Sequence, residues 1–341
     1  LPNRSLSFDG SDDYVSIMDD ESLTSTSAMT ISAWFKKVSG AGWMSIVGKG
    51  TSDVNEEYVL MLKDDQVYFD VGQGGGPYLQ QSTTIAPETW HHIAAVHTRS
   101  GNTSTLKVFL NGEDVGGTTV GASYTPNDNS YPLTIGSRWF SGSYGLFQGQ
   151  IDDVRIWNNA LDGQQIQENM YNNLPGYEDG LVGYWDFNDG EGSTLTDLSG
   201  NENDGTIYGA TWSDDIMQPP YNGPEWFVSM DGSDDNNGSE EYPFGSIQHA
   251  VDVANDYDMV QVFSGEYFEN IIINKNIHIG GNNEDGDITI NGDRNGSVFT
   301  IDSDSDPLSV QFFGIRIIDG RSEKGGGIFA RNAYVEMHGC Q

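Results

Sequence analysis

The sequence predicts an all-β protein with two parts, a two-sheet jelly-roll sandwich and then the start of a right-handed parallel β-helix. In the first half, apolar and polar residues alternate with the period of two that a half-buried strand requires. The 43 Gly and 11 Pro suit a chain that turns often. In the second half, short apolar runs recur at uneven intervals between Asn, Gly and Asp, which favours stacked coils.

Short alternating segments account for most of the first 160 residues, and Gly, Asn or Asp marks the reversals between them. They are 5–8, 14–17, 29–37, 45–50, 56–72, 90–98, 106–117, 131–137 and 148–157. The evident helix is 160–173, where Leu161, Ile166 and Met170 lie roughly on one face and Asp162 can cap the N-terminus. Many strands and a single short helix favour a two-sheet sandwich of the jelly-roll type.

The pattern of apolar and polar residues changes after a proline-containing linker at residues 217–224. We therefore expect a first domain over 1–216 and a second over 225–341. The second begins with a strand, a polar loop and an amphipathic helix around 247–254, and then continues as short apolar runs. Because an uncapped solenoid end exposes its core, and no cap is evident before Gln341, we expect the β-helix to be truncated.

The first half resembles the laminin-G-like, concanavalin-A-like jelly rolls of secreted and surface bacterial proteins. The resemblance rests on an ordered series of motifs: SLSFDGSDDYVSI, MTISAWFK, ETWHHIAAVHT, LKVFLNGEDV, PLTIGS and GQIDDVRIWNNALDGQQIQ. Residues 180–212 resemble a segment that usually opens these domains but comes last here. We expect it to complete the same sandwich in permuted order; the alternative is the opening of a second sandwich.

The second half resembles the N-terminal cap and first coils of pectate-lyase-like β-helix proteins. The motifs are GSxxNxG, found here as GSDDNNG at 232–238, then a capping helix, and then GEYFEN at 265–270. In enzymes of this fold the catalytic acids and bases lie on the exposed face of middle coils. Only early coils are present here, so the sequence supports no catalytic assignment in this half.

The charge of the chain limits its partners. The 51 Asp and Glu outnumber the 15 Lys and Arg, which gives a net charge of −36. Such a surface repels nucleic acid and anionic lipid, and no apolar run is long enough to span a membrane. A single cysteine, Cys340, excludes an internal disulfide framework. Together with the resemblance, the charge favours an extracellular, secreted or cell-surface protein.

A calcium site is expected near the N-terminus, where DGSDD places three carboxylates in five residues. In the jelly rolls that the chain resembles, calcium commonly lies between the first and last strands. That resemblance implies Asp9, the backbone of Gly10 and Asp152 as ligands, and calcium accepts carboxylates and carbonyls alike. Asp12 and Asp13 fit the alternative of ordinary turn residues. A second loop could use Asp197, Asn201 and Asn203, although Asn and Asp also dominate plain turns.

Aromatic residues in Gly- and Ser-rich loops are candidates for stacking on sugar rings. In the jelly roll we assign this role to five of them: Trp43, Tyr78, Trp139, Phe140 and Tyr144. The alternative is that they cover the ends of the sandwich. Glucan hydrolases of this fold carry E-x-D-x-x-E on one strand, and no strand expected here has that spacing.

We therefore expect a non-catalytic, calcium-stabilised module that binds a carbohydrate or cell-surface ligand in an exported, adhesin-like bacterial protein. One alternative is the targeting module of a polysaccharide lyase or hydrolase whose active site lies in further β-helix coils. Another is a structural spacer in a surface fibre. Acids and a basic residue converging on one face of further coils would favour the enzyme, and repeated sandwiches would favour the fibre.

Overall fold

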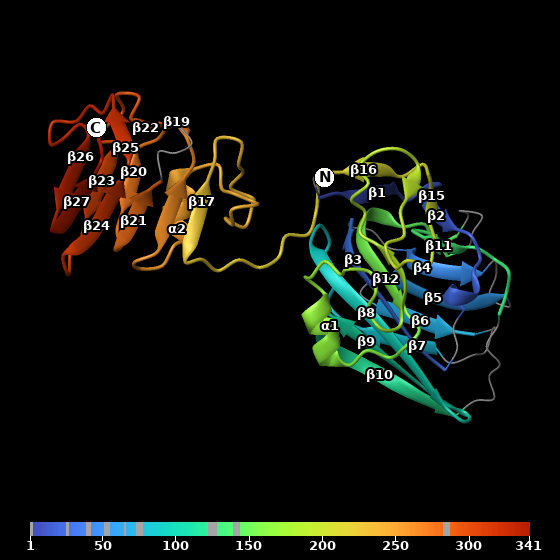
Figure 1. Ribbon diagram of the computed structural model, residues 1–341. Coiled ribbons are helices and arrows are strands. Elements are labelled where there is room, and N and C mark those ends of the chain that lie inside the picture. Colours follow the sequence, from blue (N-terminus) through green and yellow to red (C-terminus); the bar gives the residue numbers. More distant parts are fainter. Residues whose placement is uncertain are drawn as a thin grey trace. The chain divides into compact units, whose positions relative to one another are not determined.

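The computed structural model in Figure 1 describes residues 3–24, 27–38, 42–50, 55–64, 66–72, 78–121, 128–138, 144–281 and 287–341. The chain divides into two compact units, Leu1–Met217 and Gln218–Gln341. Trp139 and Phe140, two of the expected sugar-stacking residues, lie outside the described residues.

The first unit is a sandwich of two antiparallel sheets, which confirms the predicted jelly-roll architecture (Figure 1). Sheet A has the order β10 (Glu113–Gly121), β9 (Thr103–Leu110), β8 (Trp90–Ser100), β3 (Ala28–Lys37), β12 (Gln148–Trp157), β1 (Ser5–Asp9), β16 (Thr211–Ser213), and β13 (Leu181–Trp185) also pairs with β12. Sheet B has the order β14 (Thr194–Leu195), β15 (Gly205–Tyr208), β2 (Tyr14–Ile17), β11 (Leu133–Ile135), β4 (Trp43–Gly50), β5 (Glu56–Lys63), β6 (Gln66–Val71), β7 (Tyr78–Ser82).

Alternation along these strands builds the core between the sheets. In β1, Leu6 and Phe8 point inward and are buried, and in β2, Val15 and Ile17 do the same. Because successive side chains of a strand point to opposite faces, the residues between them lie on the outside of the sandwich. The two sheets thus share one apolar layer, and each has an outer face of its own.

Residues 181–213 join both sheets next to the N-terminal strands. Strand β13 pairs with β12, β15 pairs with β2 through Ile207 and Val15, and β16 pairs with β1 through Trp212 and Leu6. The segment thus lies in the same sandwich as the strands that precede it.

The outer face of sheet A carries a second apolar cluster under a short helix. Helix α1 (Gly163–Asn169) starts at the Asp162 cap, whose side chain accepts from the Gln165 amide while the Gln165 side chain accepts from the Asp162 amide. The cluster consists of Ala94, Val96, Phe109, Trp157, Leu161, Ile166, Leu181 and Tyr184.

Elsewhere in the unit, a 3-10 turn spans Glu21–Leu23.

The second unit contains three small parallel sheets. They are β17 (Glu225–Val228), β18 (Met259–Val262), β21 (Ile277–Gly280), β24 (Leu308–Phe313), β27 (Ala333–His338); β19 (Gly265–Phe268), β22 (Ile288–Asn291), β25 (Ile315–Ile318); and β20 (Ile271–Ile273), β23 (Phe299–Asp302), β26 (Ile328–Arg331). From β18 onward the chain visits the three sheets in turn, and their inward side chains form one cluster. Helix α2 (Ile247–Val253), capped by Ser246, packs against it through Ile247 and Val251. Parallel strands in this half are thereby confirmed.

Candidate functional site

An acidic triad lies in the turn between β1 and β2. One carboxylate oxygen from each of Asp9, Asp12 and Asp13 can be chosen so that all lie within 4.8 Å of one another. Asp9 and Asp12 are exposed, whereas Asp13 is buried. The triad could bind a metal ion, since three hard oxygen donors so close together suit a divalent cation.

Hydrogen bonds hold the shape of this turn. The Asp9 amide donates to the Asp13 carboxylate at 2.7 Å, and the Ser11 amide donates to Asp9 at 2.7 Å. Gly10 has φ +78°, and a Cβ there would lie 2.9 Å from that of Gln148, so the turn requires glycine. Burial raises the pKa of Asp13, and the charges of Asp9 and Asp12 raise it further, against the lowering effect of the Asp9 amide. A cation would relieve this repulsion, so these residues fit a metal ion.

Asp152 lies at a different position. Strands β1 and β12 are neighbours, as the calcium prediction required, but Asp9 pairs with Gln148 while Leu6 pairs with Ile151. Asp152 is thus four residues from the partner of Asp9, roughly 13 Å at the rise of an extended strand. Burial raises the pKa of Asp152 well above its usual range, and nearby Asp153 raises it further. The structure brings Asp9 together with Asp12 and Asp13, the two residues expected to be plain turn formers.

The second expected loop is occupied by the hydrogen bonds of the protein itself. Asp197 accepts from the amides of Tyr184, Ser199 and Asn203, all at 2.9 Å, and from the Ser199 hydroxyl. Asn201 and Asn203 both donate through Nδ2 to the Val182 carbonyl. These groups fasten the 197–204 loop to β13, which is an Asx-type turn role.

The described aromatic candidates differ in their surroundings. Tyr144 is half-buried beside Arg138, with the guanidinium 5.7 Å from its ring centre. The Trp43 ring packs edge-on against Tyr68 at 4.6 Å between centroids, with the Lys63 ammonium 4.9 Å above it. Tyr78 is 62% exposed. Of these three residues, Tyr78 is therefore the aromatic most available to a ligand.

Trp43 and Tyr78 lie on the same face, the outer side of sheet B. Strand register defines three ranks of outward residues across β4 to β7: Trp43, Lys63, Gln66, Ser82; then Ser45, Met61, Tyr68, Gln80; then Gly48, Val59, Asp70, Tyr78. The β4 and β5 members of the second and third ranks, such as Val59 and Met61, are covered. The β6 and β7 members are half-buried or exposed, so this half of the face is open.

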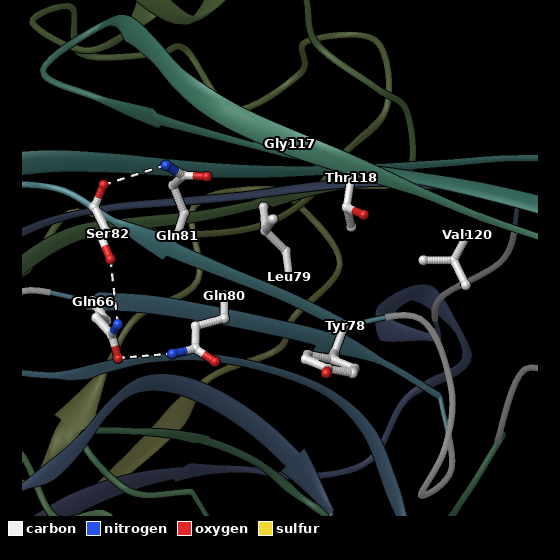
Figure 2. A pocket seen from close by; sticks show the side chains of 9 residues that line it. All are labelled: Gln66, Tyr78, Leu79, Gln80, Gln81, Ser82, Gly117, Thr118 and Val120. Carbon is white, nitrogen blue, oxygen red and sulfur yellow. Dashed lines mark hydrogen bonds between the residues drawn. The ribbon is translucent and has the colours of Figure 1, made fainter.

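A pocket of about 490 Å³ adjoins this open half. It lies where β7, the edge strand of sheet B, meets β10, the edge strand of sheet A (Figure 2). Its lining residues are Gln66, Tyr78, Leu79, Gln80, Gln81, Ser82, Gly117, Thr118 and Val120.

A chain of hydrogen bonds orders the polar wall of this pocket, as Figure 2 shows for the Gln residues. Gln66 Oε1 accepts from Gln80 at 2.9 Å and from the Tyr68 hydroxyl at 2.7 Å, and its Nε2 donates to the Ser82 hydroxyl at 3.3 Å. Because Gln66 uses both ends of its amide, it holds the neighbouring polar side chains in fixed orientations.

Sequence reasoning found Tyr78 but missed the glutamines. The segments QVYFDV and YLQQS do show polar residues on one side of a strand, so the alternation held a signal for an outward polar face. That β7 and β10 would meet was not visible, since it depends on how the two sheets are stacked.

Known proteins share the fold of this unit. Residues 9–167 match a laminin G family, described as the concanavalin A-like lectin/glucanases superfamily. A structure described as a "putative carbohydrate binding protein" from Bacteroides ovatus shares 22% identity and a TM-score of 0.50, covering 62% of this chain and 60% of its own. The Ruminococcus gnavus sialidase CBM40 bound to α2,3-sialyllactose shares 14% identity at a TM-score of 0.41, with 49% and 97% covered.

Residues 9–167 are therefore a concanavalin A-like domain of the laminin-G type. The chain spans about 60% of the length of the Bacteroides ovatus protein. No curated protein sequence matches the chain. In the described residues, no helix has the length and apolar character that a membrane span requires.

Proposed function

We propose that the first unit is a carbohydrate-binding module whose site is the open half of sheet B together with the pocket between β7 and β10. The main support is the pocket lining, where hydrogen-bonded Gln and Ser groups lie together with Thr118 and the exposed ring of Tyr78. The description of the Bacteroides ovatus structure supports the same reading at the level of the fold.

The chemistry of this wall suits sugars. A pyranose presents hydroxyls, which donate and accept, and an apolar ring face. Amide side chains offer both a donor and an acceptor, and hydroxyls do the same. Tyr78 supplies a flat apolar surface with a polar tip, and Leu79 and Val120 supply the apolar part of the lining. A concave site with a few oriented polar groups is the usual form of a small-ligand site.

Calcium has a structural role in this proposal, at the triad of Asp9, Asp12 and Asp13. The turn joins β1, in sheet A, to β2, in sheet B. An ion there would offset the mutual repulsion of three carboxylates and hold the two N-terminal strands in place. The site is separate from the sugar pocket, so calcium would act through stability.

For the second unit we propose the start of a right-handed parallel β-helix. Support comes from the order in which the chain visits the three parallel sheets, and from registers that stack one strand of each sheet on the next. With a net charge of −36, an exported protein at the cell surface or beyond fits both units. The sugar-binding unit would then attach this protein to a glycan.

The test uses the full 341-residue chain on a glycan array, followed by titration of each bound glycan. We expect Gln66→Ala and Gln80→Ala each to weaken binding by roughly five- to tenfold, the effect of about 1–1.4 kcal/mol per lost hydrogen bond. The matched control is Gln164→Ala, an exposed Gln on α1 that pairs with Glu168, and it should bind like the parent. Retention of no glycan, or equal binding by all variants, would contradict the proposal.

A further inference from the structure

The described residues that line the pocket between β7 and β10 carry no formal charge. Their polar groups are amides and hydroxyls, and none of these described residues has a carboxylate, ammonium, guanidinium or imidazole. In a chain with 51 acidic and 15 basic residues, a pocket of this size whose described lining has no acid is a distinct environment.

The pocket takes in amides from both faces of β7, with Gln80 on the outward face and Gln81 on the opposite one, and both are oriented by bonds within the protein. Gln80 donates from Nε2 to Gln66, and Gln81 donates from Nε2 to the Ser82 carbonyl at 3.3 Å. Each amide nitrogen has a second N–H, so each Gln keeps one donor and a carbonyl acceptor for a ligand. Gly116 contributes space, because a Cβ there would lie 2.6 Å from Gln81 Oε1. A hydroxyl matches such a donor–acceptor pair, whereas an anionic oxygen can use only the donor.

The charged groups next to the pocket do not favour an anion. Lys63 is opposite Gln66, and its ammonium lies over the Trp43 ring. Lys107 is opposite Gly117, and its ammonium pairs with Asp114 at 3.1 Å. Asp70 is opposite Tyr78 on the same face. A carboxylate or sulfate in the pocket would therefore gain no full countercharge in exchange for the part of its water that it gives up, which is unfavourable.

We infer that this pocket selects uncharged saccharides and rejects glycans that carry carboxylate or sulfate groups. The inference rests on the proposed carbohydrate binding and names the class of glycan that the site takes. Hydrogen bonds and ring contacts carry the recognition, so the affinity for a neutral glycan changes little between 50 mM and 500 mM salt, in contrast to a charge-driven site.

The experiment presents the full chain with pairs of oligosaccharides that share a backbone and differ only in charge, such as methyl-esterified and free galacturonans, or plain and sulfated galactans. We expect the uncharged member of each bound pair to bind at least tenfold more tightly. Gln80→Lys, which places an ammonium in the wall, should reduce that preference by several-fold. Gln164→Lys on α1 adds the same charge at a distance and should leave the preference unchanged.

Each outcome is decisive. Preference for the uncharged members that Gln80→Lys weakens supports the inference. Equal or tighter binding of the charged members, or a preference that Gln80→Lys leaves intact, overturns the selectivity while carbohydrate binding stands. Retention of neither member of any pair overturns the carbohydrate-binding proposal, and the inference with it.

Discussion

The two outer faces of the sandwich consist of similar strands, but they are covered to different extents. On sheet A, the outward residues of β8 include Ala94 and Val96, and these are buried under α1 and the segment around Leu181. On sheet B, the outward residues of β6 and β7 include Gln66 and Gln80, and this part of the face stays accessible. The difference follows from composition, since an apolar outer face needs cover and a hydrogen-bonded polar face does not.

Stability and binding depend on different parts of the same unit, the covered outer face of sheet A and the pocket. The covered face holds buried charged or titratable groups, among them Arg155 and His92, whereas the described residues that line the pocket include no Asp, Glu, Lys, Arg or His. We therefore expect substitutions on the covered face to change the free energy of unfolding, and substitutions at the pocket to change affinity. The predictions below test this separation, beginning with the largest effect.

The largest expected effect comes from Arg155 in the covered face. Its guanidinium contacts both carboxylate oxygens of Asp153, at 2.5 and 2.6 Å, and donates to the carbonyls of Asn169 and Asn172. Arg155→Met leaves Asp153 in place without its partner, so we expect a loss of about 3–5 kcal/mol in the free energy of unfolding, measured with urea. Gln80→Ala serves as the control. If Arg155→Met loses less than about 1 kcal/mol, or if its folded molecules bind the glycan more weakly, stability and binding are not separated between the two faces.

The second prediction concerns pH and His92. Burial, with a further contribution from the Arg155 charge, lowers the pKa of His92 to about 3. Because the unfolded chain takes up a proton near pH 6.5 and the folded one does not, stability is full above that pH and falls as the pH drops toward the folded value. Between pH 7 and pH 5 this group costs roughly 2 kcal/mol. We expect His92→Phe to flatten the dependence of the free energy of unfolding on pH by that amount.

In His92→Phe, part of the dependence of the free energy of unfolding on pH remains because of His97. Burial lowers the pKa of His97 to about 4, so this residue also makes the folded state less stable as the pH falls. Glycan affinity should stay constant over the same range, because the described residues that line the pocket include no carboxylate, imidazole or amine. An unaltered pH slope in His92→Phe, or an affinity that follows the pH slope of stability, would contradict the separation of the two faces.

The smallest expected effect is that of calcium. If the ion binds the folded turn, millimolar Ca²⁺ should add about 1–2 kcal/mol of stability and chelator should remove it. Asp13→Asn should abolish the response to Ca²⁺, whereas Asp152→Asn should retain it, because Asp152 lies four residues beyond the partner of Asp9 on β12. If Asp152→Asn loses the response to Ca²⁺ and Asp13→Asn keeps it, the ion binds at another site.

The sequence predicted the faces of the strands better than their positions along one another. Alternation in the segment 5–8 predicted a strand with one buried face, and its apolar residues Leu6 and Phe8 are both buried. The family resemblance implied that Asp9 and Asp152 share an ion between neighbouring strands. The two strands are neighbours, but that leaves the register open, and the register separates the two residues. The triad instead depends on a turn of five residues, where the acids are close in the chain itself.

The sequence did not predict the pocket, for a related reason. Its two walls, β7 and β10, are edge strands of different sheets and are separated by β8 and β9 in the chain. The outward position of Gln80 follows from alternation, but the meeting of the two edges follows from how the sheets stack. In the second unit the apolar runs predicted parallel strands, because a buried face requires apolar residues whichever sheet each strand joins.

Hydrogen–deuterium exchange of the full chain, with and without a bound uncharged oligosaccharide, tests most directly whether the glycan binds between β7 and β10. We expect slower exchange in the peptides that contain residues 78–82 and 117–120, the two walls of the pocket. We expect no change in residues 157–185, which cover the other face. Protection confined to 157–185, or to the second unit, would contradict binding at this pocket.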